Sequence, residues 1–404
     1  MSGPRFLNCI VLVVGLGFFA SSPAPSTPLV MQAASDVVSP GTTWEVTTCE
    51  SEGIDAESIK TLVADIEAGK YGLVDHFLLI RHGKVVADHH FEQDYDSIFA
   101  KADDQTNQQY NYDHPAWHPF YRDTNLHTLQ SVTKSITSAA LGIALDEGLI
   151  PDGVKTKAMS FFEDHEIDLD DPRKIAMTLE DLLTMRSGLD WNEMISYDDA
   201  TNSCIQMEAS DEWIRFVLDH PMREDPGTKF DYNSGVSVLL GKIVRETTGK
   251  RIDEYARAKL FEPIGINNSY WKVTPDGEID TEGGLYLEPH DLARIAYLFL
   301  RQGEWDGTQI ISREWVEKST SPIIPDIVPD DGRPNQGYGY QWWVPKHEEG
   351  KSIVYRGSGY GGQFPIIVPH LDLVIVFNAW NIHGRAEKNT QTAVHDIIIP
   401  AVSK

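Results

Sequence analysis

Strand patterns occur near both ends of this 404-residue chain, and helical patterns fill the long stretch between them. Residues 76–91 and 338–380 contain short apolar runs bounded by turn residues, which is typical of strands. From Ser131 to about residue 303, apolar residues recur mainly at helical spacing. One sheet must therefore take strands from both ends, because each strand has to bury an apolar face. This predicts an α/β fold of the α+β type, with a mostly helical region inserted in the middle.

The same pattern predicts where the parts of the chain begin and end. Residues 1–34 are expected to form a signal peptide and leader, and residues 35–404 a single domain. Within that domain, the sheet would come from about 45–128 and 300–404, and the helical region from about 129–299. Smaller predicted elements are a helix in DAESIKTLVADIEAG, a hairpin in HFLLIRHGKVVADHHF with its turn at His82 and Gly83, and a closing helix from about Glu387.

The first residues have the composition of a secretory signal. Arg5 precedes an apolar run from Cys9 to Ala20, which gives way to small residues and prolines. The alternative is an uncleaved anchor, but the run is shorter than the roughly 20 residues of a membrane-spanning helix. The mature protein is therefore expected to be secreted or periplasmic. Cys49 and Cys204 would remain, either paired as a disulfide or as two separate thiols.

Charge excludes several classes of partner. The chain has 34 Lys and Arg against 61 Asp and Glu, a formal net charge of -27. Such a surface repels nucleic acid and anionic membranes. Its 41% of hydrophobic residues also exceeds what a disordered chain contains. We expect a globular protein that acts on small molecules, with no nucleic-acid partner and no stable membrane insertion of the mature chain; its oligomeric state is left open.

A candidate nucleophile opens the helical stretch. Ser131 and Lys134 are three residues apart in Ser131-Val132-Thr133-Lys134, so on a helix they share one face. A serine hydroxyl must lose its proton to a base before it can attack, and a lysine can help if burial lowers its pKa. The alternative is a helix cap followed by an exposed lysine, because this spacing occurs by chance about once in a chain of this length.

Three further segments favour the catalytic interpretation. PGTKFDYNSGVSVLLGKIVRETTG places Tyr232 in a turn just before an amphipathic helix. YRGSGYGGQFPIIVP is a glycine cluster before an apolar strand, where Gly359 or a neighbour could offer a backbone N–H. TLEDLLTMRSGLDW lies between Ser131 and Tyr232 and predicts a helix that ends at Gly188.

With these segments in this order, the chain resembles the serine β-lactamase and penicillin-binding-protein superfamily. The similarity is strongest to its class C β-lactamase-like branch of esterases, DD-peptidases and 6-aminohexanoate-dimer hydrolases. It extends from about residue 50 to residue 400 and rests on TLQSVTKSITSAALGIALDEG, TLEDLLTMRSGLDW and FDYNSGVSVLLGKIV. The resemblance implies a β-lactamase/transpeptidase-like fold, an antiparallel sheet flanked by helices, and an acyl-enzyme mechanism.

The resemblance also implies roles for individual residues. Ser131 would be the acylated nucleophile and Lys134 its proton-handling partner. Tyr232 would be the second acid/base group, either as a phenolate or through a proton shared with Lys134. The oxyanion hole would consist of the N–H groups of Ser131 and Gly359.

Two positions depart from the family pattern. Ser234 stands where the family has an asparagine, so contacts to an acylamino group would differ. The third motif has neither Lys nor His. We match it to Gly357-Ser358-Gly359, with Ser358 in contact with substrate, and Tyr355-Arg356-Gly357 is the other register. Arg356 is then the nearest candidate to bind a substrate carboxylate. These departures favour an esterase or amidase over a true β-lactamase.

Other residues with catalytic or metal-binding chemistry are interpreted as structural. The group His89, His90, Glu92 and Asp94 is not expected to bind a metal, because adjacent strand residues point to opposite faces. The chain contains neither His-Glu-x-x-His nor Gly-x-Ser-x-Gly. No role is assigned to Trp117, Trp191, Trp342 and Trp343. We expect no metal and no organic cofactor.

The sequence therefore predicts an exported serine hydrolase that cleaves an ester or amide through an acyl intermediate on Ser131. One alternative is a penicillin-interactive DD-peptidase or β-lactamase-like enzyme acting on cell-wall peptides. Another, from a different class, is an inactive binding protein on the same fold, against which the intact Ser131, Lys134 and Tyr232 argue. The natural substrate is left open.

Overall fold

The computed structural model describes the chain in six stretches. These are residues 40–99 without residue 42, 124–165, 167–327, 336–345, 354–382 and 386–402. All of them belong to one compact unit, Val37–Lys404. The predicted signal peptide and leader lie outside the described residues, as do Trp117 and most of the polar segment around it.

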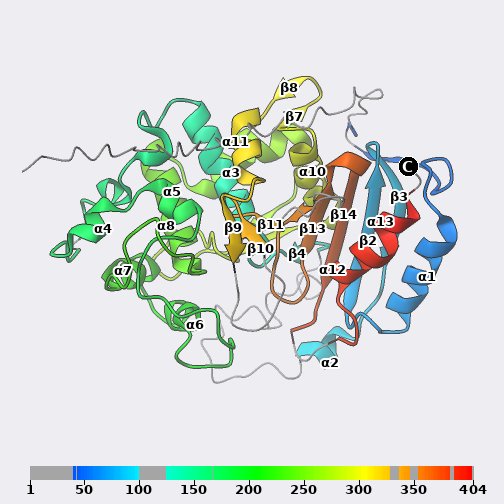
Figure 1. Cartoon of the computed structure of the whole chain (residues 1–404), viewed down its shortest axis with the longest axis horizontal. Coiled ribbons are helices and arrows are strands. Elements are labelled where there is room, and N and C mark those ends of the chain that lie inside the picture. Colours follow the sequence, from blue (N-terminus) through cyan, green and yellow to red (C-terminus); the bar gives the residue numbers. More distant parts are fainter. Residues whose placement is uncertain are drawn as a thin grey trace, which may run out of the picture. The chain divides into compact units, whose positions relative to one another are not determined.

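A nine-stranded sheet joins the two ends of the domain (Figure 1). Its order is β1-β3-β2-β14-β13-β12-β11-β10-β9, and every neighbouring pair is antiparallel except β1 with β3. The strands are β1 (Glu45–Val46), β2 (Val74–Arg81), β3 (Lys84–His90), β9 (Ile324–Ile327), β10 (Gln336–Tyr338), β11 (Trp343–Pro345), β12 (Tyr355–Arg356), β13 (Phe364–Val368) and β14 (Leu373–Ala379). The central pair β2 and β14 sets Phe77 opposite Phe377. The expected antiparallel sheet built from both ends is confirmed.

The predicted hairpin is present between β2 and β3. Its turn residues His82 and Gly83 have φ angles of 50° and 78°. Two successive positive φ angles are typical of a type I′ turn, whose twist matches that of paired strands.

Helices form most of the middle of the chain, as predicted. They are α3 (Val132–Asp146), α4 (Pro172–Ala176), α5 (Leu179–Leu183), α6 (Ser203–Glu208), α7 (Trp213–Asp219), α8 (Ser234–Thr248), α9 (Ile252–Ala256), α10 (Pro289–Leu300) and α11 (Arg313–Ser319). Every residue of α3 from Val132 to Ala144 is buried, so α3 is the central helix of this region. The predicted end of α5 at Gly188 is wrong: the helix stops at Leu183, and Met185 adopts a φ of 57°.

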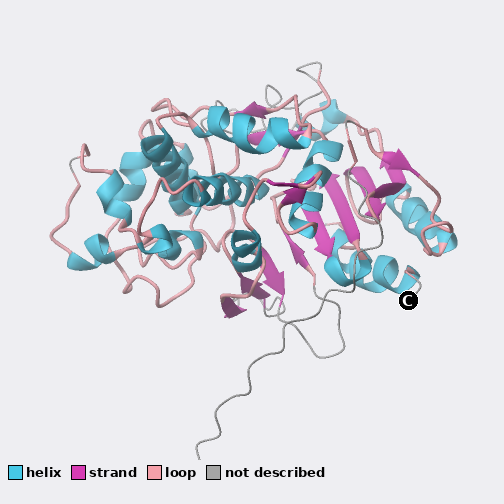
Figure 2. Ribbon diagram, turned by 90° about the horizontal axis from the view of Figure 1, so that it is seen from above, coloured by secondary structure: helices cyan, strands magenta, loops and turns pink. Residues whose placement is uncertain are grey.

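The two faces of the main sheet pack on different groups of helices (Figure 2). On β14, Val374 and Val376 belong to the core that includes α3 and α10. Their neighbours Ile375 and Phe377 face the opposite core, as strand alternation requires. That second core is covered by α1 (Ala56–Glu67) and by the C-terminal segments α12 (Thr390–Ala393), a π-helical turn (Val394–Ile398) and α13 (Ile399–Ala401). A further short α-helix is α2 (Tyr95–Phe99).

A three-stranded sheet supports the candidate site. It has the order β4-β6-β5, with β4 (His127–Thr128), β5 (Tyr270–Trp271) and β6 (Leu285–Leu287). His127 and Thr128 thus belong to this smaller sheet and not to the main sheet, where they were expected. A separate hairpin consists of β7 (Glu304–Trp305) and β8 (Thr308–Gln309).

Two further predictions concern the cysteines and the membrane. Cys49 and Cys204 are both buried free thiols, which decides against the disulfide alternative. Among the described residues, no helix has the length and apolar character needed to cross a bilayer.

Candidate active site

Ser131 stands at the start of α3, directly after a tight bend. β4 ends at Thr128, and Gln130 then adopts a φ of 49°. Ser131 occupies the N-cap position, but its hydroxyl makes no capping hydrogen bond. The alternative of a simple helix cap with an exposed lysine is therefore wrong, since Lys134 is 1% exposed.

The three N–H bonds of Lys134 each have an acceptor. Nζ lies 2.8 Å from Ser131 Oγ, 2.8 Å from the Glu282 carbonyl oxygen and 3.1 Å from Glu282 Oε2. Burial by itself lowers the pKa of Lys134, but Tyr232, Glu282 and Glu193 outweigh it and raise that pKa above its ordinary value. The condition of a lysine pKa lowered by burial is thus not met here, because buried acidic groups surround Lys134. Lys134 is an ammonium group in this arrangement.

Tyr232 completes the contacts of the nucleophile. The Ser131 hydroxyl lies close enough to the Tyr232 phenol to lower its pKa, and Lys134 Nζ lies 5.4 Å from the centre of the Tyr232 ring. Lys134 donates to Ser131 Oγ, so the hydroxyl proton of Ser131 must point elsewhere, and the Tyr232 oxygen can accept it. Burial raises the pKa of Tyr232, and the Lys134 ammonium opposes that rise. The Tyr232 ring stacks on Trp343 with centroids 5.8 Å apart, so this tryptophan shapes the site.

Glu193 is a buried carboxylate at the N-terminus of α8. It accepts from Trp191 Nε1 at 2.7 Å, Tyr197 Oη at 3.0 Å, and both the N–H (2.7 Å) and the hydroxyl (2.6 Å) of Ser234. A negative charge is favourable at the positive end of a helix. The Ser234 hydroxyl is fully buried and bound to Glu193, so in this structure it positions α8 instead of facing a substrate.

A further group of buried charges lies behind Lys134. Glu208 is hydrogen-bonded to Glu282, and burial, together with the neighbouring Glu282, raises the pKa of Glu208 well above its usual range. The raised pKa favours the protonated form of Glu208. Asp280 Oδ1 accepts the N–H groups of Glu282 and Gly283 at 3.2 and 3.0 Å, which orients the Glu282 backbone.

Sequence reasoning missed Glu282 and Glu193. Glu282 contacts a lysine 148 positions earlier in the chain, and Glu193 contacts a serine 41 positions later. Neither carboxylate belongs to a spacing pattern, so no local signal marks it. The only local hint for Glu282 is its position in Glu282-Gly283-Gly284, directly before the short buried strand β6.

The third motif lies against the turn that carries Ser131. A methyl group on Gly359 would lie 2.3 Å from the Leu129 carbonyl oxygen, and one on Gly357 would lie 3.1 Å from a Val132 methyl carbon. This close approach favours the register Gly357-Ser358-Gly359, with Ser358 half-buried between the two glycines. The Gly359 N–H donates to the Gln363 carbonyl oxygen at 2.9 Å, so the predicted second oxyanion donor is already engaged.

The other register lies within β12. The Tyr355 hydroxyl donates to the Phe299 carbonyl oxygen at 3.3 Å. Arg356 is buried, donates to Gln336 Oε1 at 2.6 Å and pairs across the strands with Trp343. Arg356 is therefore one strand away from the tryptophan that stacks on Tyr232.

The group His89, His90, Glu92 and Asp94 does not come together. His89 stacks on Phe77, with ring centroids 6.4 Å apart, whereas His90 Nε2 lies 3.8 Å from Asp75. Asp94 accepts the Ser97 N–H at the start of α2. The opposite orientation of the two adjacent histidines agrees with strand alternation.

The chain is similar in sequence to a known family and to several known proteins. A model of the beta-lactamase family matches residues 62–395. The chain is 27% identical over 271 residues to a 6-aminohexanoate-dimer hydrolase from Paenarthrobacter ureafaciens, covering 63% of this chain and 66% of that enzyme. It is 28% identical over 162 residues to a lovastatin esterase from Penicillium rubens, covering 36% of this chain and 40% of the esterase. These alignments span about two thirds of the first relative and less than half of the second.

A solved structure shares the fold. The octameric penicillin-binding protein homologue from Pyrococcus abyssi superposes with a TM-score of 0.62 at 20% identity, over 86% of this chain and 78% of that protein. The described architecture is thus a known one, in which a largely antiparallel sheet is flanked by helices.

Proposed function

The chain belongs to the beta-lactamase family, an enzyme family of the serine hydrolase type, and from this premise we propose that it cleaves an ester or amide through an acyl intermediate on Ser131. The supporting observation is the contact set of the Ser131 hydroxyl. Lys134 donates to its oxygen and Tyr232 is its other partner. A nucleophile needs this arrangement, with an acceptor for its proton and a cation beside its developing charge.

The proposed first half-reaction forms the acyl enzyme. Ser131 Oγ attacks the carbonyl carbon of the substrate as its proton passes to the Tyr232 phenolate oxygen. The Lys134 ammonium stabilises negative charge on both oxygens and remains protonated throughout. The tetrahedral intermediate then collapses, its bond to the leaving group breaks, and Tyr232 returns the proton to the departing alcohol or amine.

The second half-reaction repeats these steps with water. Water gives a proton to Tyr232 and attacks the acyl carbon, the acid product leaves, and Ser131 recovers its proton. The Ser131 N–H has no acceptor within the described part of the chain and is directed to the oxyanion in this proposal. A neighbour of Gly359 in the same loop would supply the second donor, since the Gly359 N–H is engaged.

We favour an ester or simple amide as the substrate over a cell-wall peptide. Ser234 is bound to Glu193 and Arg356 to Gln336, so neither is poised for an acylamino group or a substrate carboxylate. Among the relatives, one is named an esterase and another a hydrolase of the 6-aminohexanoate dimer. A fluorescent penicillin that labels Ser131 at a rate comparable with an activated ester would favour the peptidase alternative instead.

Covalent labelling tests the proposal directly. Intact-mass spectrometry after treatment with a fluorophosphonate should show a single adduct, and peptide mapping should place it on Ser131. Ser135→Ala is the matched control, because Ser135 lies on the same helix but donates to the Gln341 carbonyl oxygen at 2.7 Å. An adduct that persists in Ser131→Ala would refute the assignment. Absence of both labelling and ester hydrolysis in the wild type would favour the inactive binding protein.

Export is a separate part of the proposal and rests on the first residues of the sequence. Expression with the full N-terminus, followed by N-terminal sequencing of protein from the medium or periplasm, should show cleavage after the apolar run that ends at Ala20. Protein recovered only from membranes with Met1 intact would support the anchor alternative.

A further inference from the structure

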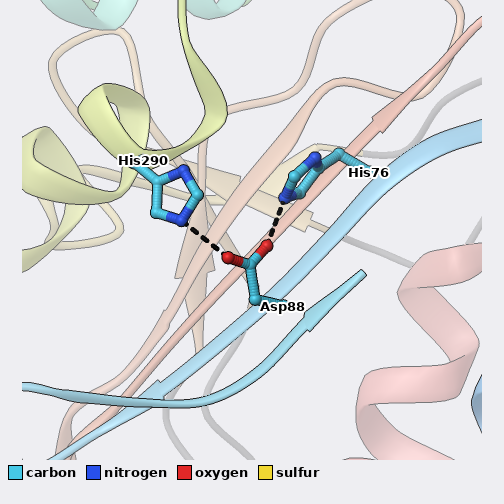
Figure 3. A group of neighbouring side chains, drawn as sticks. All are labelled: His76, Asp88 and His290. Carbon is cyan, nitrogen blue, oxygen red and sulfur yellow. Dashed lines mark hydrogen bonds and ion pairs between the residues drawn. The ribbon is translucent and has the colours of Figure 1, made fainter. Parts of the chain in front are cut away.

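Two histidines and an aspartate converge outside the Ser131 site (Figure 3). His76 is on β2, Asp88 on β3 and His290 in the first turn of α10. His76 Nε2 lies 2.7 Å from Asp88 Oδ1, and His290 Nε2 lies 2.9 Å from Asp88 Oδ2. The potential ligand atoms all lie within 4.8 Å of one another.

The register of the hairpin explains this convergence. Leu78 pairs with Asp88 and His76 pairs with His90, so His76 and Asp88 are diagonal neighbours on one face of the sheet. That face packs against α10, as the burial of Leu78 in the shared core shows. The start of α10 therefore brings His290 over the two strand residues.

The two histidine rings also line a cavity of about 470 Å³. His90, His127 and Asp75 line the same cavity, so its wall is rich in imidazole. His127 is 3% exposed, and its Nδ1 lies 3.0 Å from the Thr128 carbonyl oxygen, which places the ring proton on Nδ1. Its buried Nε2 has no hydrogen-bond partner among the described residues.

The neighbour of that nitrogen is a carboxylate. His127 Nε2 lies 3.5 Å from Asp75 Oδ2. The cavity wall thus combines carboxylate and imidazole groups, the two kinds of side chain in the proposed ligand set.

We propose that His76, Asp88 and His290 bind a divalent transition-metal ion, such as Zn²⁺, through the two Nε2 atoms and one carboxylate oxygen. Imidazole nitrogen with a single carboxylate is a ligand set for Zn²⁺ and its neighbours in the first transition row, whereas Ca²⁺ and Mg²⁺ require mostly oxygen. Three protein ligands leave a coordination position open to water or to an anionic group entering the cavity.

Each histidine contacts a different oxygen of Asp88, at a separation close to that between two ligands of one metal ion. Tetrahedral ligands at roughly 2.0–2.1 Å from zinc are about 3.3 Å apart, slightly more than the present nitrogen-to-oxygen separations. Asp88 and His290 can move by this amount because their side chains are 39% and 37% exposed. For Nε2 to bind the metal, each ring must carry its proton on Nδ1. A neutral ring changes tautomer, and an imidazolium ring releases one proton to solvent.

Metal titration of the chelator-treated full chain tests the site. We expect one equivalent of Zn²⁺ by calorimetry, and Co²⁺ should produce the visible absorption of a low-coordinate site with nitrogen ligands. His290→Ala and Asp88→Asn should each weaken binding by about 10- to 100-fold. His89→Ala is the matched control, because His89 is on the same strand as Asp88 but stacks on Phe77. Binding should also weaken on acidification, because protons compete for the rings.

Failure of the metal-site proposal can be distinguished from failure of the hydrolase proposal. Metal binding should be unchanged in Ser131→Ala, and fluorophosphonate labelling should be unchanged in the folded His290→Ala protein. The metal site is refuted if the wild type binds no Zn²⁺, or if Asp88→Asn and His290→Ala bind as tightly as His89→Ala. Circular dichroism melts verify that each variant is folded, and His290 is suited to substitution because it is partly exposed in the first turn of its helix.

Discussion

At the Ser131 site, the state of a single lysine depends on carboxylates from distant segments. Burial alone would lower the pKa of Lys134. Glu282 accepts a hydrogen bond from Lys134, and Glu193 adds a second negative charge nearby, so the pKa is raised instead. In the proposed mechanism the Lys134 ammonium is therefore not the base for Ser131. Tyr232 is assigned as the acceptor in this proposal, which is one of the two roles expected for it.

The pair Glu282 and Glu208 allows the proton positions to be tested. Glu282→Gln removes the negative charge beside Lys134, and breaking a buried ion pair costs about 3–5 kcal/mol of stability. We expect this variant to unfold at lower denaturant concentration and to lose at least about tenfold in kcat. Glu208→Gln should be nearly neutral, because the raised pKa of Glu208 favours the protonated acid, which an amide resembles.

Steady-state hydrolysis of a p-nitrophenyl ester and urea unfolding measure these two effects. The assignment would be reversed if Glu208→Gln were the more damaging change, because Glu282 would then be the protonated acid.

The pKa of Tyr232 determines how kcat/KM should change with pH. Burial raises its pKa above the ordinary value of 10.0, although Lys134 limits the rise. Below that pKa the phenolate fraction increases about tenfold per pH unit, so kcat/KM should rise towards alkaline pH. Tyr232→Phe should remove this dependence and lower kcat/KM by about 10²- to 10⁴-fold. Rates from pH 6 to 10 on folded protein test this, and an alkaline rise that survives in Tyr232→Phe would exclude Tyr232 as the base.

Between elements, the site depends on a loop from the main sheet lying against the start of α3. Gly359 makes this approach possible, because its missing side chain leaves room for the Leu129 carbonyl oxygen. Ser131 is thus held from two sides, by the short strand β4 before it and by the glycine loop beside it.

Gly359→Ala should disturb this contact. The added methyl group would overlap the Leu129 oxygen at 2.3 Å, so either the loop or the bend before Ser131 must shift. A shift of about 1 Å can cost on the order of 100-fold in rate, and we expect fluorophosphonate labelling of Ser131 to slow by at least tenfold. Gly148→Ala is the control: it meets open space at a φ of 73°, so it should lose about 1 kcal/mol of stability and retain labelling. Wild-type labelling of Gly359→Ala would contradict the tight packing.

Predictions at the level of elements succeeded where the pattern was local. The helix α1, the hairpin β2–β3 and the long helix α3 follow the spacing of their own apolar residues. The end of α5 was misjudged because the backbone turns at Met185, a residue type that does not mark a positive φ. The assignment of His127 and Thr128 to the main sheet failed because strand partners are not encoded in so short a segment.

For the molecule as a whole, the large negative charge has a consequence for stability. A formal net charge of -27 makes the folded state repel itself, and added salt shortens the range of that repulsion. The melting temperature at pH 7 should rise as NaCl increases from about 10 to about 200 mM. The rise should shrink near pH 5, where acidic groups begin to bind protons. A melting temperature at pH 7 that does not change with NaCl would show that the charges are already compensated locally.

The sequence alone determined the types of most elements, the joining of both chain ends in one sheet and the candidate residues Ser131, Lys134 and Tyr232. These depend on periodicity and on motifs a few residues long. Only the tertiary structure decided which charges surround Lys134, where Ser234 and Gly359 direct their hydrogen bonds, and that His290 meets Asp88 from 202 positions away. The physical reason is that pKa values and ligand sets depend on burial and on charges within a few ångströms, which distant segments supply only after the chain has folded.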